Sequence, residues 1–280
     1  MTPTSWSSGR FTGAGSRETY PSGVQQWWVL TTRSIVPTLR NGELLTQVAA
    51  SIMFTAGFYI PLKNFMGLYA AEMSSYAQYL MPLIALQAIS FAAISGAFRS
   101  ASDAIEGINR RFRALPISRV TPLASRMTAS MYRCTVALVI SLICGYVIGF
   151  RFYAGTLYTV AFCGLVLAIG LTLSFLGEVV GTASRNPDAT THLMMLPQLI
   201  FGLLSVGVQP ASAFPRWIQG FVRNQPISQF VYALRALAGD RIPGAAGAIT
   251  WQTIGPSLAW IAALWVVLMP VYAVLTGRKG

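Results

Sequence analysis

Residues 156–180 read TLYTVAFCGLVLAIGLTLSFLGEVV, an apolar stretch whose single charged residue, Glu178, lies near its end. A helix that crosses a lipid bilayer needs about 20 mostly apolar residues in a row. A strand of a membrane barrel is shorter, with about 9–11 residues, and it alternates apolar with polar side chains. The stretch is long and continuously apolar, and it therefore predicts a transmembrane α-helix.

Similar stretches occur on both sides of it, and the only charge inside them, away from their ends, is Arg133. They are residues 44–62, 79–98, 126–150, 191–209 and 252–275. The chain of 280 residues is 54% hydrophobic and 10% charged, with a mean hydropathy of +0.56, whereas a soluble domain carries about 25% charged residues. We therefore expect an all-α membrane protein with six transmembrane helices.

The basic residues of the chain indicate how it is oriented. Six spans put both termini on one side, and if that side is the cytoplasm, 14 of the 20 Lys and Arg residues face it. The six on the other side are Lys63, Arg151, Arg216, Arg223, Arg235 and Arg241. Because an excess of Lys and Arg marks cytoplasmic loops, we expect a multi-pass protein of the plasma membrane with both termini in the cytoplasm. This orientation accounts for the net charge of +12 without a nucleic-acid partner.

The N-terminal part divides into a polar tail and an amphipathic segment. Residues 1–22 lack the apolar core of a secretory signal and predict a disordered cytoplasmic tail. The next segment, residues 23–40, has Val24 and Trp28 on one helical side and Arg33 on another. Tryptophan is enriched at the membrane–water interface, so we expect an N-terminal interfacial helix that opens a membrane domain of residues 23–280.

The loop between the second and third apolar stretches predicts a short amphipathic helix over residues 101–115. Ser100 followed by Asp103 fits an N-terminal capping signal, and Pro116 ends the pattern. Acidic residues fall in its first turns and arginines in its last, which suits the helix dipole. The residues that we assign to a candidate docking surface are Asp103, Glu106, Arg110, Arg111, Phe112, Arg113, Leu115 and Pro116.

Two interpretations of this helix are open. It could lie on the membrane with its arginines on lipid phosphates, or it could dock into a cytoplasmic partner protein. A lipid surface has little use for Asp103 and Glu106, whereas a protein groove can pair both charge signs. We therefore favour docking to a protein.

Residues 210–251 form an outer segment that is punctuated by proline. The pattern predicts a helix that starts at Pro226 and ends at Gly239, and about a dozen residues are too few to cross the bilayer. Such a segment has to dip into the membrane and return, as a lid over an exit path, or form a passive outer loop. Its candidate functional residues are Asn224, Pro226, Phe230, Leu234 and Arg235.

Polar and small residues inside the spans suggest where helices meet. Gln47, Gln87 and Gln198 are amides in apolar stretches, where an amide bonds a neighbouring helix or lines a substrate path. The pairs Gly145 with Gly149 and Gly177 with Gly181 have the spacing that permits close helix contact.

We find no sequence motif for ATP binding, proton coupling or metal binding in the chain. A P-loop is absent, because neither of the two lysines, Lys63 and Lys279, follows a glycine loop. We find no carboxylate in the middle of a span of the kind that proton-coupled carriers use, and the single histidine, His192, has no metal-ligand spacing. We expect no cofactor or metal and no enzymatic activity, only a membrane path that a separate ATPase drives. An ATP-independent carrier or channel, or a membrane tether for a cytoplasmic enzyme, are the alternatives.

Three segments carry a resemblance to a known family: residues 103–120, residues 145–153 and residues 221–241. From about Gln25 to Leu275 the chain resembles the membrane subunits of ABC-2 type exporters, in particular the daunorubicin/doxorubicin-resistance permeases of actinobacteria. The resemblance implies six membrane helices, an N-terminal interfacial helix, a cytoplasmic coupling helix after the second span and an extracellular re-entrant segment.

The same resemblance implies partners and cargo. A working unit would contain two permease subunits, identical or different, and two ATP-binding cassette subunits, with ATP bound to the latter. The hydrophobic substrate would be an antibiotic or a cell-wall lipid of the phthiocerol dimycocerosate type. Since we find no acid in the spans to pair with a drug amine, the residues tilt the choice slightly toward a lipid.

Overall fold

The computed structural model describes residues 22–40, 42–66, 75–108, 118, 120–184, 186–239 and 249–277, and within these ranges it is helical, without a strand. The helices are α1 (Gly23–Arg40), α2 (Glu43–Met66), α3 (Tyr76–Ile105), α5 (Val120–Ile148), α6 (Thr156–Ala183), α7 (Pro187–Leu203), α8 (Arg216–Asn224), α9 (Pro226–Ala238) and α10 (Trp251–Gly277). A single 3-10 turn, Ala211–Ala213, precedes α8.

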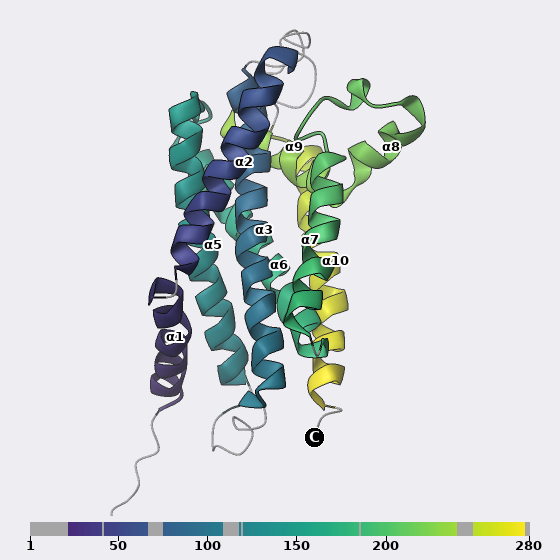
Figure 1. The fold of residues 1–280 in the computed structure, drawn as a ribbon. Coiled ribbons are helices and arrows are strands. Elements are labelled where there is room, and N and C mark those ends of the chain that lie inside the picture. Colours follow the sequence, from purple (N-terminus) through teal and green to yellow (C-terminus); the bar gives the residue numbers. More distant parts are fainter. Residues whose placement is uncertain are drawn as a thin grey trace, which may run out of the picture.

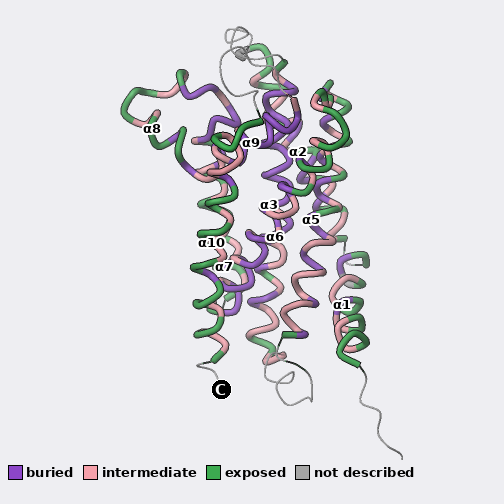
Figure 2. The backbone as a smooth tube through the Cα atoms, turned by 180° about the vertical axis from the view of Figure 1, so that it is seen from behind, coloured by how far each residue is buried: buried purple, intermediate pink, exposed green. Residues whose placement is uncertain are grey.

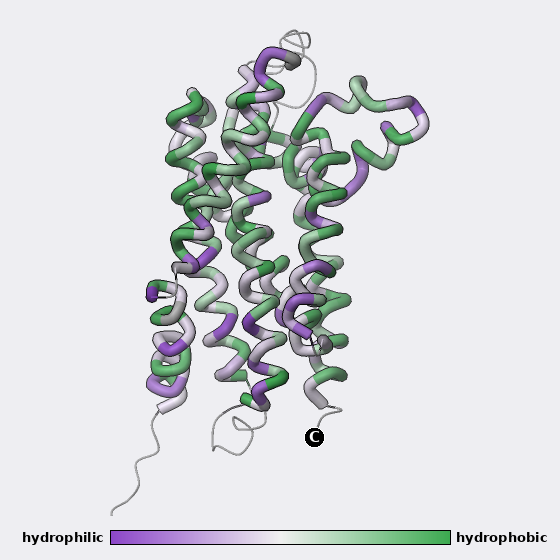
Figure 3. Tube along the Cα trace, viewed as in Figure 1, coloured by the Kyte–Doolittle hydropathy of each residue, from purple (hydrophilic) through white to green (hydrophobic). Residues whose placement is uncertain are grey.

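The long helices run side by side in one bundle (Figure 1). Helix α1 points the same way as α2, and from α2 on successive long helices point in opposite directions. The start of α1 and the end of α10 lie at the same end of the bundle, which we call the terminal end. The short helices α8 and α9 lie at the opposite end. Apolar residues cover most of the length of the long helices (Figure 3).

Within the described ranges, five helices are long and apolar enough to cross a membrane: α2 over Glu43–Asn64, and the whole of α3, α5, α6 and α10. The exception among the expected spans is α7, which has 17 residues and so a length of about 25 Å. It begins earlier than expected, because the Asn186 side chain accepts hydrogen bonds from the backbone of Asp188 and Ala189, as an N-cap does.

The far end of α7 stops at Leu203 rather than continuing to residue 209. Polar side chains from the start of α9 replace the backbone bonds that the helix gives up there. Gln225 Nε2 donates to the carbonyls of Phe201 and Leu204, at 2.8 and 3.0 Å, and the Ser228 hydroxyl accepts from Val206 N at 3.2 Å. The outer segment therefore terminates the helix.

The centre of the bundle is α3, the most deeply buried of the candidate spans (Figure 2). Its most extensive contacts are with α6, and two glycines of α6 allow them. A Cβ on Gly177 would lie 3.0 Å from Ala97 Cβ, and one on Gly181 would lie 2.6 Å from Ala97 O. This pair thus permits close helix contact, whereas Gly149 of the other predicted pair sits in a turn with φ +104° and nothing within 4 Å.

The expected separate helix over residues 101–115 needs correction. Residues up to Ile105 are the last turns of α3, so Ser100 and Asp103 lie inside a helix rather than at its start. The break comes at Gly107, whose φ of +69° glycine adopts without steric cost. The capping signal was overridden because Ala101 is fully buried against the rest of the bundle, and that packing favours continuation of α3.

The remainder of the expected docking surface, apart from Glu106, lies outside the described residues: Arg110, Arg111, Phe112, Arg113, Leu115 and Pro116.

Candidate functional site

An ion-pair triad with one fully buried member, Glu178, joins three helices near the terminal end of the bundle. Arg126 of α5 donates from Nη1 to Glu178 Oε1 of α6 at 2.6 Å, and from Nη2 to Asp103 Oδ2 of α3 at 2.7 Å. The Glu178 side chain is 4% exposed. A charge in such a place is tolerated only when it is paired and hydrogen-bonded, so Glu178 requires Arg126.

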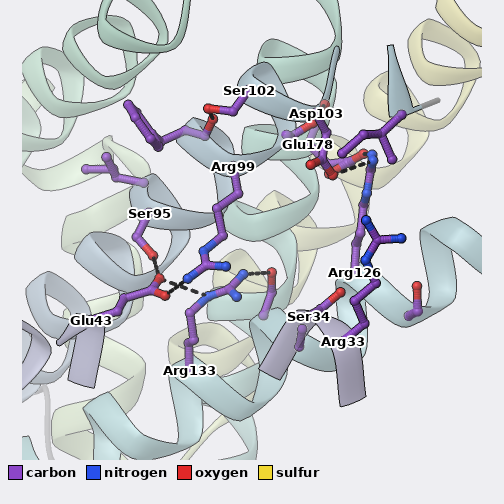
Figure 4. Close-up of a pocket in the computed structure, with 18 of the residues that line it drawn as sticks. Arg33, Ser34, Glu43, Ser95, Arg99, Ser102, Asp103, Arg126, Arg133 and Glu178 are labelled. Atoms are coloured by element: carbon purple, nitrogen blue, oxygen red, sulfur yellow. Dashed lines mark hydrogen bonds and ion pairs between the residues drawn. The ribbon is translucent and has the colours of Figure 1, made fainter. Parts of the chain in front are cut away.

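A second charged group lies beside it, around Glu43 in the first turn of α2. The Glu43 carboxylate accepts from Ser95 Oγ and from Arg99 Nη2, both on α3. The guanidinium of Arg133 on α5 approaches the same carboxylate, with Nε 3.9 Å from Oε1, and Figure 4 shows these side chains converging. Arg133 also donates from Nη2 to Ser130 Oγ at 2.7 Å.

Room for the Arg133 guanidinium comes from a glycine on α3. A Cβ built on Gly96 would lie 3.1 Å from Arg133 Nη2 and 3.3 Å from Ser130 Oγ. The absence of a side chain at Gly96 is therefore part of what lets a buried arginine stand between α3 and α5.

The two charged groups line one cavity of about 720 Å³. Its walls come from α1, the first turn of α2, the last turns of α3, the first half of α5, and single residues of α6 and α7, so it lies toward the terminal end (Figures 1 and 4). A volume of this size is within the range of about 300–1,000 Å³ that small-molecule sites occupy. Among the described residues, no group of three or more His, Cys, Asp or Glu side chains is placed to hold a metal ion.

At the opposite end, Arg235 of α9 is buried without a carboxylate partner in the described part of the chain. Its Nε donates to Tyr79 O at 3.0 Å and its Nη2 to Val206 O at 2.7 Å. The guanidinium also lies 3.3 Å from the centroid of the Tyr79 ring, whose hydroxyl donates to the same Val206 carbonyl at 2.6 Å. This contact, the Arg235 staple, fixes α9 to the start of α3 and to the chain after α7.

The other expected residues of the outer segment have distinct surroundings. Phe230 and Leu234 are buried in the main apolar core, together with residues of α3 and α6. Pro226 is the first residue of α9. Asn224 is exposed at the end of α8, where its side chain donates to Gly220 O.

The three amides in the spans do not line the charged cavity. Gln198 of α7 donates from Nε2 to Gln87 Oε1 of α3 at 3.2 Å, and a Cβ on Gly202 would lie 2.7 Å from Gln87 Nε2. This pair links two helices, which is the first of the two roles considered for it. Gln47 is buried on α2, and neither of its side-chain polar atoms has a hydrogen-bond partner among the described residues.

The charged cavity was not predicted from the sequence, and two of its acidic residues were placed at the end of a span or just outside one. It placed Glu178 at the end of a span, but α6 continues to Ala183, so Glu178 lies inside the helix and is buried. Glu43 was left just outside the first span, although α2 begins with it. The available signal was Arg133, because a charge inside an apolar span requires a partner from another span.

Comparison with known proteins places the chain in a family. The sequence profile of a family described as ABC-2 family transporter protein matches residues 31–273. The doxorubicin resistance ABC transporter permease protein DrrB of Mycobacterium tuberculosis is 51% identical over 260 residues, which cover 91% of this chain and 90% of the relative.

Two further relatives are more distant. The probable doxorubicin resistance ABC transporter permease protein DrrC of Mycobacterium tuberculosis is 29% identical over 228 residues, covering 76% of this chain and 81% of that protein. The daunorubicin resistance ABC transporter permease protein DrrB1 of Streptomyces coeruleorubidus is 27% identical over 175 residues, covering 62% and 61% of the two chains. The chain belongs to the ABC-2 family of transporter proteins.

Proposed function

We propose that the chain is the permease subunit of an ABC exporter that moves a hydrophobic drug or a lipid out of the cell. The observation that carries the proposal is the match over residues 31–273, which spans all five candidate membrane helices together with α7, α8 and α9, except the last residues of α10. The named relatives are permeases associated with resistance to doxorubicin or daunorubicin.

The energy for export would come from a separate ATP-binding cassette subunit, because the chain has no P-loop of its own. The docking surface that we propose for that subunit comprises Asp103 and Glu106, at the end of α3, together with Arg110, Arg111, Phe112, Arg113, Leu115 and Pro116. The ATP-binding subunit would then contact the end of α3 where Asp103 pairs with Arg126 of α5, which in turn pairs with Glu178 of α6.

We further propose six membrane crossings, with α7 as the fifth and with both termini in the cytoplasm. The excess of basic residues on the terminal side under this arrangement supports it. The charged cavity then opens from the cytoplasmic half of the protein, and α8 and α9 lie at the outer surface. There they act as a re-entrant lid, held down by the Arg235 staple.

A second permease subunit would complete the path, and either an identical or a different chain fits what is known of this one. The exposed apolar side chains of α10, which include Val266, Val267 and Val274, face lipid or that second subunit.

The test is reconstitution of the chain with its ATP-binding partner in lipid vesicles. We expect doxorubicin or an extractable cell lipid to stimulate ATP hydrolysis and to be moved in an ATP-dependent manner. A catalytically dead ATP-binding subunit is the matched control. Transport that persists with it would establish an ATP-independent carrier, and complete absence of transport, with a cytoplasmic enzyme still recruited, would establish a tether.

A further inference from the structure

The donors and acceptors that line the charged cavity bear on the substrate. We propose that it binds the polar end of an amphiphile whose head group is anionic or rich in acceptor oxygens, and that it does not bind a cationic amine, so that an amine-bearing drug would have to bind outside this cavity. The inference deepens the proposed function, because such a site in one subunit would receive cargo from the cytoplasmic side. It rests on which donors and acceptors in the cavity are already used.

Every carboxylate that lines the cavity among the described residues is already paired. Glu178 and Asp103 share the Arg126 guanidinium, at 2.6 and 2.7 Å. Glu43 accepts from Ser95 and Arg99. A cationic head group would have to displace one of these partners, and the displaced arginine would then be left without its charge partner in a partly buried site.

Donors, in contrast, are left over on two arginines that line the same cavity (Figure 4). Arg133 is 3% exposed, yet its Nε has no hydrogen-bond partner among the described residues and is 3.9 Å from Glu43. Arg33 of α1 is exposed, and no described residue forms an ion pair or accepts a hydrogen bond from its side chain. A planar guanidinium with free N–H groups binds carboxylate or phosphate oxygens well.

The net charge of the cavity lining also favours an anionic head group. Its described lining carries the arginines Arg33, Arg99, Arg126 and Arg133 against the acids Glu43, Asp103 and Glu178. The net charge of this lining is +1. The cavity is partly shielded from water, and electrostatic attraction there is stronger than in bulk water. An anionic head would neutralise that charge.

An apolar wall is available for the rest of the amphiphile. Leu30 of α1 and Phe91, Ile94 and Phe98 of α3 line the cavity beside the charged groups. Phe98 is 41% exposed, so part of this wall is accessible from outside the core. A head group bound to Arg33 and Arg133 would therefore have hydrocarbon surface next to it for the start of its chain.

The proposal can be tested by photo-crosslinking on the full chain in discs of phosphatidylcholine. The probes are a photoreactive long-chain carboxylate and a long-chain trimethylammonium with the same photoreactive tail, and labelled peptides are identified by mass spectrometry. We expect the carboxylate to label the segments around Leu30 and Phe91–Phe98 saturably, and the ammonium not to do so.

Three variants sharpen the test. Arg33→Gln should weaken the apparent affinity for the carboxylate about tenfold, equivalent to about 1.4 kcal/mol, and because Arg33 is exposed the fold should persist. Arg133→Gln should weaken it as well, but only variants that elute as the native species count. Arg216→Gln removes an exposed arginine of α8 at the opposite end and should change nothing. Equal or stronger labelling by the ammonium, or labelling that Arg33→Gln leaves unchanged, would overturn the proposal.

Two sources could supply the head group, a resident anionic phospholipid or the transported amphiphile. Adding phosphatidylglycerol to the discs separates them: full competition identifies the phospholipid, and retained carboxylate labelling identifies the transported molecule, both on an anion-selective site. Because no ATP-binding subunit is present, failure of this test leaves the permease function untouched. Failure of ATP-dependent transport would likewise leave the binding result standing.

Discussion

The guanidinium of Arg126 lies 2.6 Å from the carboxylate of Glu178, and this contact ties α5 to α6 in the interior of the bundle. Replacing Arg126 with Met would leave Glu178 buried and unpaired, and breaking a buried pair in this way costs about 3–5 kcal/mol. We expect a markedly lower melting temperature for Arg126→Met, measured by fluorescence-detected size-exclusion chromatography in detergent. Arg223→Met, at an exposed position of α8, is the matched control, and equal melting temperatures for the two would show that the triad is not structural.

The close approach of α3 and α6 predicts a second effect. In Gly181→Ala the new Cβ would lie 2.6 Å from Ala97 O and 2.8 Å from Ser100 Cβ. The helices would have to separate, at a cost of about 1–3 kcal/mol, as is typical of overpacking. Gly164→Ala on the same helix meets nothing within 4 Å and should retain the wild-type melting temperature. The idea fails if both alanines are tolerated equally.

The Arg235 staple predicts that even a conservative change at this position is harmful. Lysine keeps the charge, but a single ammonium cannot bond the carbonyls of Tyr79 and Val206 and also cover the Tyr79 ring. We expect Arg235→Lys to cost about 2 kcal/mol, the size of a hydrogen bond to a charged group, and to increase proteolysis within the outer segment. Arg223→Lys serves as the control, and an unchanged digestion pattern in Arg235→Lys would contradict the assignment.

The proposed docking surface makes a prediction about coupling. Reversing Arg110 and Arg113 to Glu should release the ATP-binding subunit or uncouple its activity, because buried charges at an interface contribute more than charges at its rim. The amount of permease in the membrane should stay the same. Co-purification and substrate-stimulated ATP hydrolysis are the measurements. Wild-type values for both would instead favour a helix that lies on the membrane surface.

The orientation of the chain can be tested by labelling single cysteines in intact cells. A cysteine at position 212, in the segment before α8, should react with a membrane-impermeant maleimide. A cysteine at position 102, in the last turns of α3, should react only after the membrane is permeabilised. The reverse pattern would invert the topology and place the charged cavity on the outer side.

The bundle could be predicted in large part from apolar runs, because run length and continuity alone distinguish a spanning helix from other structures. The end of α3 could not, since Ser100 and Asp103 present the same local pattern at a helix start and within a helix. Burial of Ala101 decides between the two, and burial is a property of the whole bundle. The end of α7 could not be predicted for a similar reason. The side chains that bond its last carbonyls and the following chain, Gln225 and Ser228, lie about 20 residues further along the sequence.

The candidate site was harder to predict from the sequence than the fold, because its contacts depend on tertiary structure. Arg133 could be recognised as unusual from its apolar surroundings in the sequence, but no spacing rule identifies its neighbour as Glu43, which is two helices away. The same holds for Arg235, whose partners are carbonyl oxygens and an aromatic ring rather than an acid. Periodicity identifies the face of a helix, and it does not identify what that face meets.

The Arg126 triad and the Arg235 staple together restrict how the protein can move. Arg126 forms an ion pair with Asp103 in the last turns of α3, and Arg235 donates a hydrogen bond to Tyr79 O in its first turn. Sliding or tilting α3 would break these ion pairs and hydrogen bonds, so we expect α3 to move least during a transport cycle. We expect larger movements of α10, because only 6% of its most apolar part is buried, against 78% for α3.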